Sequence, residues 1–171
     1  MKKIAFVTGM TGQDGPYLAK HLLENDYKVY GLVKRYSNPN LSNLAYLGIE
    51  NKIELITGDI TDDSNMNHLI KTLRPNEFYN LAAQSFVGAS WELNKTTTEV
   101  NALGVLNILN AIVGHNPTTK FYQASTSELY GNSTINGVQD EKTPFHPRSP
   151  YGISKLYAYW MTVNFRESYS L

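Results

Sequence analysis

Tyr151 and Lys155 are the two side chains of this sequence whose types and spacing most directly suggest chemistry. They stand four residues apart in "YGISK", a spacing that places both on one face of a helix. A phenol has an unperturbed pKa of about 10 and is a weak base at neutral pH. A nearby ammonium stabilises the phenolate and lowers that pKa. The pair could therefore exchange a proton with an alcohol or sugar hydroxyl.

A second set of polar residues comes earlier in the chain, in "STSELYG" at 125–131. Ser125 and Thr126 follow an apolar segment, where small hydroxyl residues are ordinary turn material. Glu128 is either a solvated turn residue or a group that takes a proton in a reaction. Beside a tyrosine and lysine pair, the hydroxyl and carboxylate favour an acid/base site.

Three glycines form the clearest binding motif. Gly9, Gly12 and Gly15 in "TGMTGQDG" follow an apolar segment and open a helical one. In that setting the backbone can turn tightly and approach a pyrophosphate, with helix N–H groups directed at it. The GxxGxxG spacing resembles that of the short-chain dehydrogenase/reductase superfamily.

The end of the second predicted strand indicates which nicotinamide cofactor is used. An acidic residue there favours NAD, whereas cations favour the 2′-phosphate of NADP. The segment "GLVKRYS" offers Lys34, Arg35 and the hydroxyl of Ser37, with no acid nearby. The sequence therefore predicts NADP.

The elements that must position these residues alternate between strand and helix. Short apolar runs end in Gly or polar residues, and helical spacing of apolar residues separates them. This pattern predicts an α/β fold, a Rossmann-type doubly wound parallel sheet in three α/β/α layers, as one domain. Strands are expected within 3–9, 28–33, 52–60, 77–83 and 119–125, helices within 15–27, 62–75, 96–116 and 149–171, and a helical turn within 38–48.

Composition restricts the possible partners. The 171 residues have a formal net charge of zero and 42% hydrophobic residues, so neither nucleic acid nor an anionic membrane is an expected partner. Cysteine is absent and the four histidines show no metal-ligand spacing. We expect no secretion signal, no membrane span and a cytoplasmic location.

Five stretches resemble the GDP-mannose 4,6-dehydratase family: "TGMTGQDGPYLAKHLLE", "GDITDDSN", "YNLAAQSFV", "FYQASTSELYG" and "PRSPYGISKLYAYWMTVNFRESY". The resemblance implies a lyase that converts GDP-mannose to GDP-4-keto-6-deoxymannose, moving a hydride from C4 to C6 through bound NADP with loss of water. It also implies a homo-oligomer in which the two long helices pair between subunits.

The resemblance also implies a set of site residues. Thr126 would bind the reacting C4 oxygen, Glu128 would take the C5 proton, Tyr151 would take the hydroxyl proton, and Lys155 would hold the nicotinamide ribose. Contacts with NADP are implied for Gly9, Met10, Thr11, Gly12, Gln13, Asp14, Gly15, Lys34, Arg35, Tyr36, Ser37, Asp59, Ile60, Leu81, Ala82, Ala83, Gln84, Ser85, Thr96, Tyr151 and Lys155.

Members of this family continue beyond the Tyr-Lys helix, whereas this sequence stops at Leu171. We therefore expect residues 1–171 to form an incomplete NADP-binding Rossmann domain, truncated after that helix, without the substrate domain and with its fifth strand at an exposed edge. Two alternatives stay open. One is a related enzyme, such as a UDP-glucuronate decarboxylase or a nucleotide-sugar reductase. The other is an inactive fragment that binds NADP.

Overall fold

A five-stranded parallel sheet forms the centre of the computed structural model, which describes residues 2–34 and 39–171. The strands are β1 (Ile4–Thr8), β2 (Lys28–Val33), β3 (Glu54–Thr57), β4 (Glu77–Asn80) and β5 (Lys120–Gln123), in the order β3-β2-β1-β4-β5. Each neighbouring pair is parallel. The strand order reverses between β1 and β4, which is where ligands bind in open α/β sheets.

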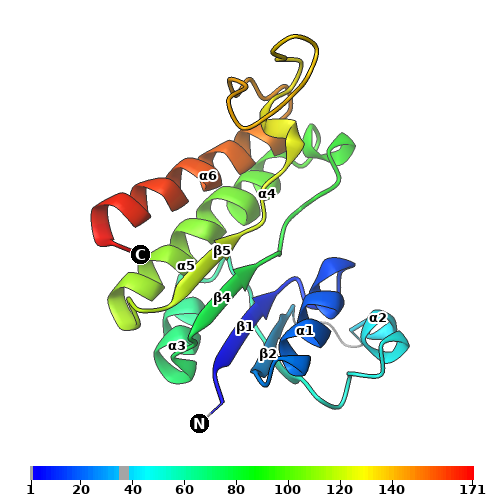
Figure 1. The fold of residues 1–171 in the computed structure, drawn as a ribbon, viewed down its shortest axis with the longest axis vertical. Helices are drawn as coiled ribbons and strands as arrows, with labels where there is room; N and C mark the ends of the chain where they lie inside the picture. The colour runs from blue at the N-terminus through cyan, green and yellow to red at the C-terminus, as the bar shows by residue number, and fades with distance from the viewer. Residues whose placement is uncertain (1, 35–38) are drawn as a thin grey trace.

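Helices cover the sheet as the alternating pattern predicts (Figure 1). They are α1 (Asp14–Glu24), α2 (Ser42–Tyr46), α3 (Asp63–Leu73), α4 (Asn94–Thr98), α5 (Gly104–His115) and α6 (Pro150–Tyr169). The helix expected within 96–116 is confirmed and is continuous, with a π-helical segment, Glu99–Leu103, between α4 and α5. The predicted α/β Rossmann-type architecture is confirmed.

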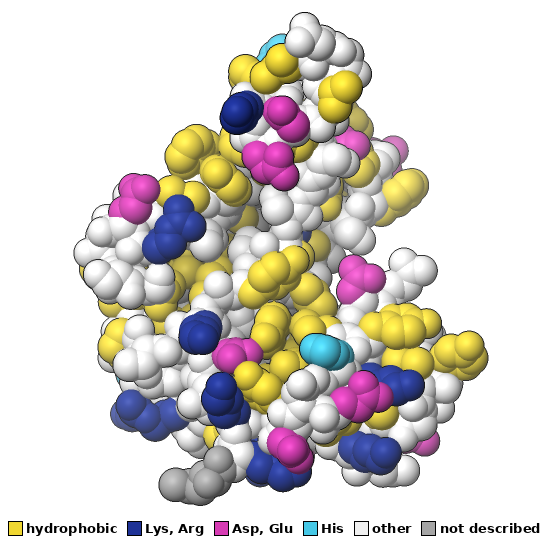
Figure 2. Space-filling view, viewed as in Figure 1, with side chains coloured by type: hydrophobic (Ala, Val, Ile, Leu, Met, Phe, Trp, Pro, Cys, Tyr) yellow, Lys and Arg dark blue, Asp and Glu magenta, His cyan; other side chains and the backbone are white. Residues whose placement is uncertain are grey.

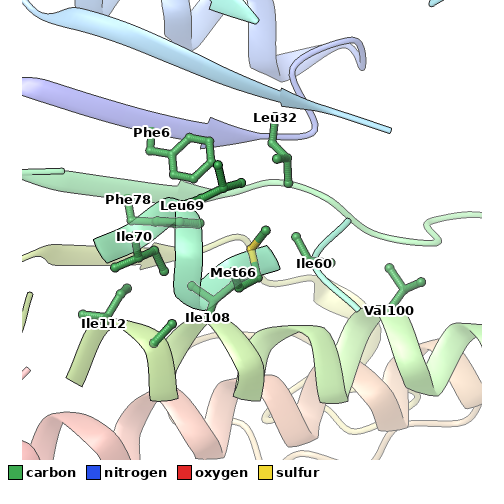
Figure 3. Close-up of a cluster of buried hydrophobic side chains, with 11 residues drawn as sticks. Phe6, Leu32, Ile60, Met66, Leu69, Ile70, Phe78, Val100, Ile108 and Ile112 are labelled. Carbon is green, nitrogen blue, oxygen red and sulfur yellow. The ribbon is translucent and has the colours of Figure 1, made fainter. Parts of the chain in front are cut away.

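Two buried clusters hold the layers together, one on each face of the sheet. Side chains alternate along β1, so Phe6 lies on one face while Ala5 and Val7 lie on the other. Phe6 stacks edge to face on Phe78, with ring centroids 5.0 Å apart. Figure 3 shows this cluster, in which Met66, Ile70, Ile108 and Ile112 of α3 and α5 meet the sheet.

The cluster on the other face joins α1 and α2 to the strands through Ala19, Leu22 and Leu44. A third, smaller cluster packs α6 on α5 through Val105, Leu109, Ala158 and Phe165. Because each apolar side chain that is fully buried contributes about 1.5–3 kcal/mol, these layers supply most of the folding energy. The core therefore fixes α6, and with it Tyr151 and Lys155, relative to the sheet.

Local sequence signals set the ends of several helices. The Asp62 carboxylate accepts a hydrogen bond from the Asn65 backbone N–H at 2.9 Å and starts α3. The Ser149 hydroxyl does the same for α6 by accepting from Gly152 N at 3.0 Å, and Pro150 occupies the first turn. Both helices begin one residue after the start of the range expected from the sequence.

Strand β5 lies at one edge of the described sheet, as expected, and its Tyr122 is 52% exposed. Residues 131–148, after β5, form a long irregular loop that projects past the end of the sheet near the start of α6 (Figure 1). Figure 2 shows acidic and basic side chains interspersed on the face in view, with no patch of a single sign. Within residues 2–34 and 39–171, no helix is long and apolar enough to cross a membrane.

Candidate active site

The glycine motif forms a tight turn between β1 and α1. Gly9 has a positive φ of 69°, and Gly12 N donates to Gly9 O at 3.0 Å. A Cβ on Gly9 would lie 2.9 Å from the carbonyl carbon of Leu81, and a Cβ on Gly15 would lie 2.5 Å from Gly9 O. The loop therefore needs glycine for its conformation at the first position and for close packing at the third.

A cleft of about 620 Å³ opens over this loop, at the carboxyl ends of the strands. Its lining brings together predicted residues from five segments of the chain, and the described part of the expected set falls there with the exceptions given below. The lining consists of Gly9, Thr11, Gly12, Gln13, Asp14, Gly15, Leu32, Val33, Lys34, Gly58, Asp59, Ile60, Leu81, Ala82, Ala83, Gln84, Ser85, Thr96 and Val100.

Some predicted cofactor residues are not in this lining. The Met10 side chain is fully buried in the core, where it packs on Gly31, so this residue offers a ligand its backbone at most. Arg35, Tyr36 and Ser37 lie outside the described residues. Tyr151 and Lys155, on α6, are also outside this lining. Leu32, Val33, Gly58 and Val100 line it without having been predicted, although their positions at strand ends and on a helix face were available signals.

Lys34 and Asp59 form an ion pair at the side of the cleft, with Nζ and Oδ2 3.3 Å apart. Burial opposes ionisation of Asp59, but hydrogen bonds from the Thr61 N–H and hydroxyl and the charge of Lys34 outweigh it and lower the pKa of Asp59. The carboxylate is thus ionised at neutral pH. Any anionic ligand that approaches Lys34 competes with it.

Lys155 is held on the buried side of α6. Its side chain is 4% exposed, and Nζ donates to the Ala124 carbonyl oxygen at 2.9 Å, just past β5. Nζ also lies 6.0 Å from the ring centroid of Tyr151, which is itself buried. Burial lowers the pKa of Lys155 from 10.5 to about 8. A lysine in this state can gain or lose a proton near neutral pH.

Thr126 and Glu128 lie against the start of α6. The Thr126 hydroxyl accepts from Glu128 N at 3.2 Å and starts a short 3₁₀ helix, Ser127–Leu129. A Cβ on Gly152 would lie 2.9 Å from the Glu128 carbonyl oxygen, so the two backbones are in contact. The structure therefore brings all four predicted catalytic residues to one end of the sheet, with Glu128 half-buried.

Asn101 connects the cleft to this group and was not singled out from the sequence. Its amide forms a reciprocal pair with the Gln84 backbone, at 2.9 Å and 3.0 Å, and donates to Ser154 Oγ at 3.2 Å. Ser154 Oγ in turn donates to the Tyr151 carbonyl at 2.7 Å. Asn101 is 1% exposed and lies in the π-helical segment. A polar residue within an apolar helix face was the available signal.

The arrangement combines a cleft over a glycine loop with a tyrosine, a lysine of lowered pKa, a hydroxyl and a carboxylate at the same end of the sheet. This combination defines a Rossmann-type protein of the short-chain dehydrogenase/reductase class. Solved structures agree. The chain overlays UDP-glucose 4-epimerase of Thermotoga maritima with a TM-score of 0.86 at 27% identity, covering 98% of this chain and 52% of that one. It overlays dTDP-glucose 4,6-dehydratase of Streptomyces venezuelae with NAD and TYD bound at a TM-score of 0.84 and 26% identity, covering 98% and 53%.

Sequence comparisons define the family. The model of the family described as GDP-mannose 4,6 dehydratase matches residues 6–171. The chain is 47% identical to GDP-mannose 4,6-dehydratase of Vibrio cholerae over all of its own length and 48% of that protein. It is also 47% identical to GDP-mannose 4,6 dehydratase of Homo sapiens, over 99% of this chain and 48% of that one. The chain belongs to the GDP-mannose 4,6-dehydratase family and spans about half the length of the curated relatives it matches.

Proposed function

We propose that the protein acts as an NADP-dependent GDP-mannose 4,6-dehydratase, a lyase that converts GDP-mannose to GDP-4-keto-6-deoxymannose. The observation that carries the proposal is the contact of the Glu128 backbone with the start of α6, the helix that also carries Tyr151 and Lys155. A simple alcohol dehydrogenase needs a hydroxyl, a tyrosine and a lysine, whereas a 4,6-dehydratase also needs a group that takes the C5 proton.

The cleft fits a dinucleotide on grounds of its own geometry. The Gly9 and Gly15 positions leave no room for a Cβ, and the opening they maintain lies beside the first turn of α1, whose N–H groups suit a pyrophosphate. The cleft residues from Gly9 to Gly15, Asp59 with Ile60, and Leu81 to Ser85 would hold the cofactor. When bound, NADP supplies a hydride acceptor for C4 of the sugar and a hydride donor for C6.

The protein side chains would carry the proton transfers. Tyr151 takes the proton of the C4 hydroxyl as the C–H bond at C4 breaks. Thr126 donates a hydrogen bond to the C4 oxygen. The resulting 4-keto group acidifies C5, and Glu128 takes the C5 proton and passes it to the C6 hydroxyl, which leaves as water. When hydride returns to C6, C5 regains a proton, which balances the proton that Tyr151 took from the C4 hydroxyl. Lys155 stabilises the Tyr151 phenolate and holds the nicotinamide ribose.

The preference for NADP over NAD rests on Lys34, with Arg35 following it in the sequence. A guanidinium and an ammonium at the end of β2 suit the 2′-phosphate, which carries more negative charge than a ribose hydroxyl. The structural relatives with NAD bound lead to the opposite expectation, so the ratio of the two affinities is a direct test. A tighter complex with NAD than with NADP would contradict this assignment.

A second candidate function follows from the length of the chain relative to its relatives. Because it spans about half of those proteins, the chain could bind NADP without turning over a nucleotide sugar. A domain comprising residues 1–171 that binds NADP stays a proposal, as do pairing of α4–α5 and α6 between subunits and a cytoplasmic location. The GDP-mannose dehydratases among the relatives give no support to the decarboxylase or reductase alternatives.

One experiment separates these functions. The protein is incubated with GDP-mannose and NADP⁺, and the products are analysed by mass spectrometry for loss of water and for a 4-keto-6-deoxy sugar. Formation of that product supports the dehydratase. NADP binding without turnover supports the binding function. Glu128→Gln is the matched variant: it should retain NADP binding and lose dehydration, and a full rate in this variant would remove the proposed role of Glu128.

A further inference from the structure

A buried chain of polar side chains crosses the carboxyl ends of three neighbouring strands. It begins at Thr8, the last residue of β1, passes through Asn80 at the end of β4, and continues to Gln123 at the end of β5. Thr8 and Asn80 are both fully buried. A buried polar group lowers the stability of the fold unless it is hydrogen-bonded, so the partner of each atom in this chain matters.

The hydrogen bonds of Thr8 set the direction of the whole chain. Its hydroxyl oxygen accepts from Leu81 N at 3.1 Å and from Ala82 N at 3.0 Å. A hydroxyl has two acceptor sites and one proton, so Thr8 must donate to its third neighbour. That neighbour is Asn80 Oδ1, at 2.6 Å.

Each amide orientation further along follows from this first bond. With Asn80 Oδ1 directed at Thr8, Asn80 Nδ2 faces Gln123 and donates to its Oε1 at 2.8 Å. Gln123 Nε2 then faces the other way and donates to the Ala124 carbonyl oxygen at 2.9 Å. The chain ends on the same oxygen that accepts from Lys155 Nζ at 2.9 Å.

We propose that Thr8, Asn80 and Gln123 are positioning residues for Lys155, because they hold in place the Ala124 carbonyl that accepts a hydrogen bond from the ammonium. The inference rests on the proposed role of Lys155 beside Tyr151. It also links two parts of the site, since Thr8 adjoins Gly9 of the glycine loop and binds the Leu81 and Ala82 N–H groups of the cleft. The same hydrogen bonds that shape the cofactor cleft thus orient the lysine on α6.

Loss of the Thr8 hydroxyl tests transmission along the chain, because Thr8 belongs to β1 and Lys155 to α6. In Thr8→Val the Asn80 amide loses its fixed orientation. If it turns, Gln123 must turn as well and present Oε1 to the Ala124 oxygen, which repels it. Thr8→Ser keeps the hydroxyl and serves as the matched control. Gln123→Met removes the final donor directly at a half-buried position, and it also removes the acceptor of Asn80 Nδ2, so its stability is measured beside its titration.

The measurement is the pH titration of Lys155, followed by NMR of the Cε carbon in ¹³C-lysine-labelled protein and assigned with Lys155→Met. We expect the midpoint in Thr8→Val and Gln123→Met to shift by about half a pH unit or more, because the Ala124 carbonyl that accepts from the ammonium is no longer held in place. Thr8→Ser should match the unaltered chain. Urea unfolding of the same proteins shows whether each variant is folded.

The outcome that overturns the proposal is a folded Thr8→Val or Gln123→Met protein whose Lys155 midpoint is the same as in the unaltered chain, even if its stability falls. If Thr8→Val does not fold, Gln123→Met alone decides. The titration uses neither cofactor nor sugar. A failed dehydration assay would therefore contradict the proposed function, while the Lys155 titration would still test the positioning role.

Discussion

Replacing Lys155 with methionine should make the folded protein more stable at neutral pH. The lysine is 4% exposed, and burial lowers its pKa from 10.5 to about 8. Folding therefore moves the charged ammonium into a buried position that disfavours the charged form. The difference between the two pKa values corresponds to a penalty of about 3 kcal/mol. Methionine retains most of the apolar stem but loses the hydrogen bond to Ala124 O, worth about 1 kcal/mol. The expected net gain is about 2 kcal/mol.

The stability difference between Lys155→Met and the unaltered chain should depend on pH. Below about pH 8 the lysine is charged in both states, and the folded state carries the full penalty. Between about 8 and 10.5 the unfolded chain binds more protons than the folded one, so the stability of the unaltered chain rises with pH. Above 10.5 the amine is neutral in both states and the penalty vanishes. The advantage of Lys155→Met should therefore shrink steadily over this interval.

Urea unfolding followed by circular dichroism at several pH values between 6.5 and 10 measures both effects. Lys20→Met, on the exposed face of α1, is the matched control and should change stability by at most about 0.5 kcal/mol at every pH. If Lys155→Met proves less stable than the unaltered chain at pH 7, the reasoning that a buried charge burdens the fold is refuted.

Three further predictions concern the cap, the loop and the ion pair. Ser149→Ala should lower the unfolding free energy by about 1 kcal/mol in urea titrations, because Gly152 N loses its acceptor, while Ser149→Asp should retain the cap; equal stability of all three would contradict a capping role. Gly15→Ala should weaken NADP binding at least about tenfold by calorimetry, because the added Cβ would lie 2.5 Å from Gly9 O. An unchanged affinity would show that the glycine loop can shift to accommodate the Cβ. Asp59→Asn frees Lys34 from its ion pair and should raise the NADP to NAD affinity ratio up to about fivefold in fluorescence titrations; a falling ratio would separate Lys34 from the 2′-phosphate.

The order and type of the elements could be predicted from the sequence because they depend on local patterns. Apolar runs gave the strands, and the helix expected within 149–171 is α6, which begins at Pro150. The glycine spacing was informative for the same reason, since positive φ at Gly9 and close packing at Gly15 are demands on those residues alone. Strand ends were predicted less well, because β4 stops at Asn80, where the chain turns toward the cleft.

The sequence by itself determined the α/β class, and it predicted a loop for a dinucleotide and four catalytic residues. Only the tertiary structure decided how these parts are connected. The pairing of Lys34 with Asp59, the bridge through Asn101 and the polar chain from Thr8 to Lys155 join residues far apart in the sequence. Each depends on strand order and on burial, which raise the energetic importance of a satisfied polar group without leaving a periodic pattern in the chain.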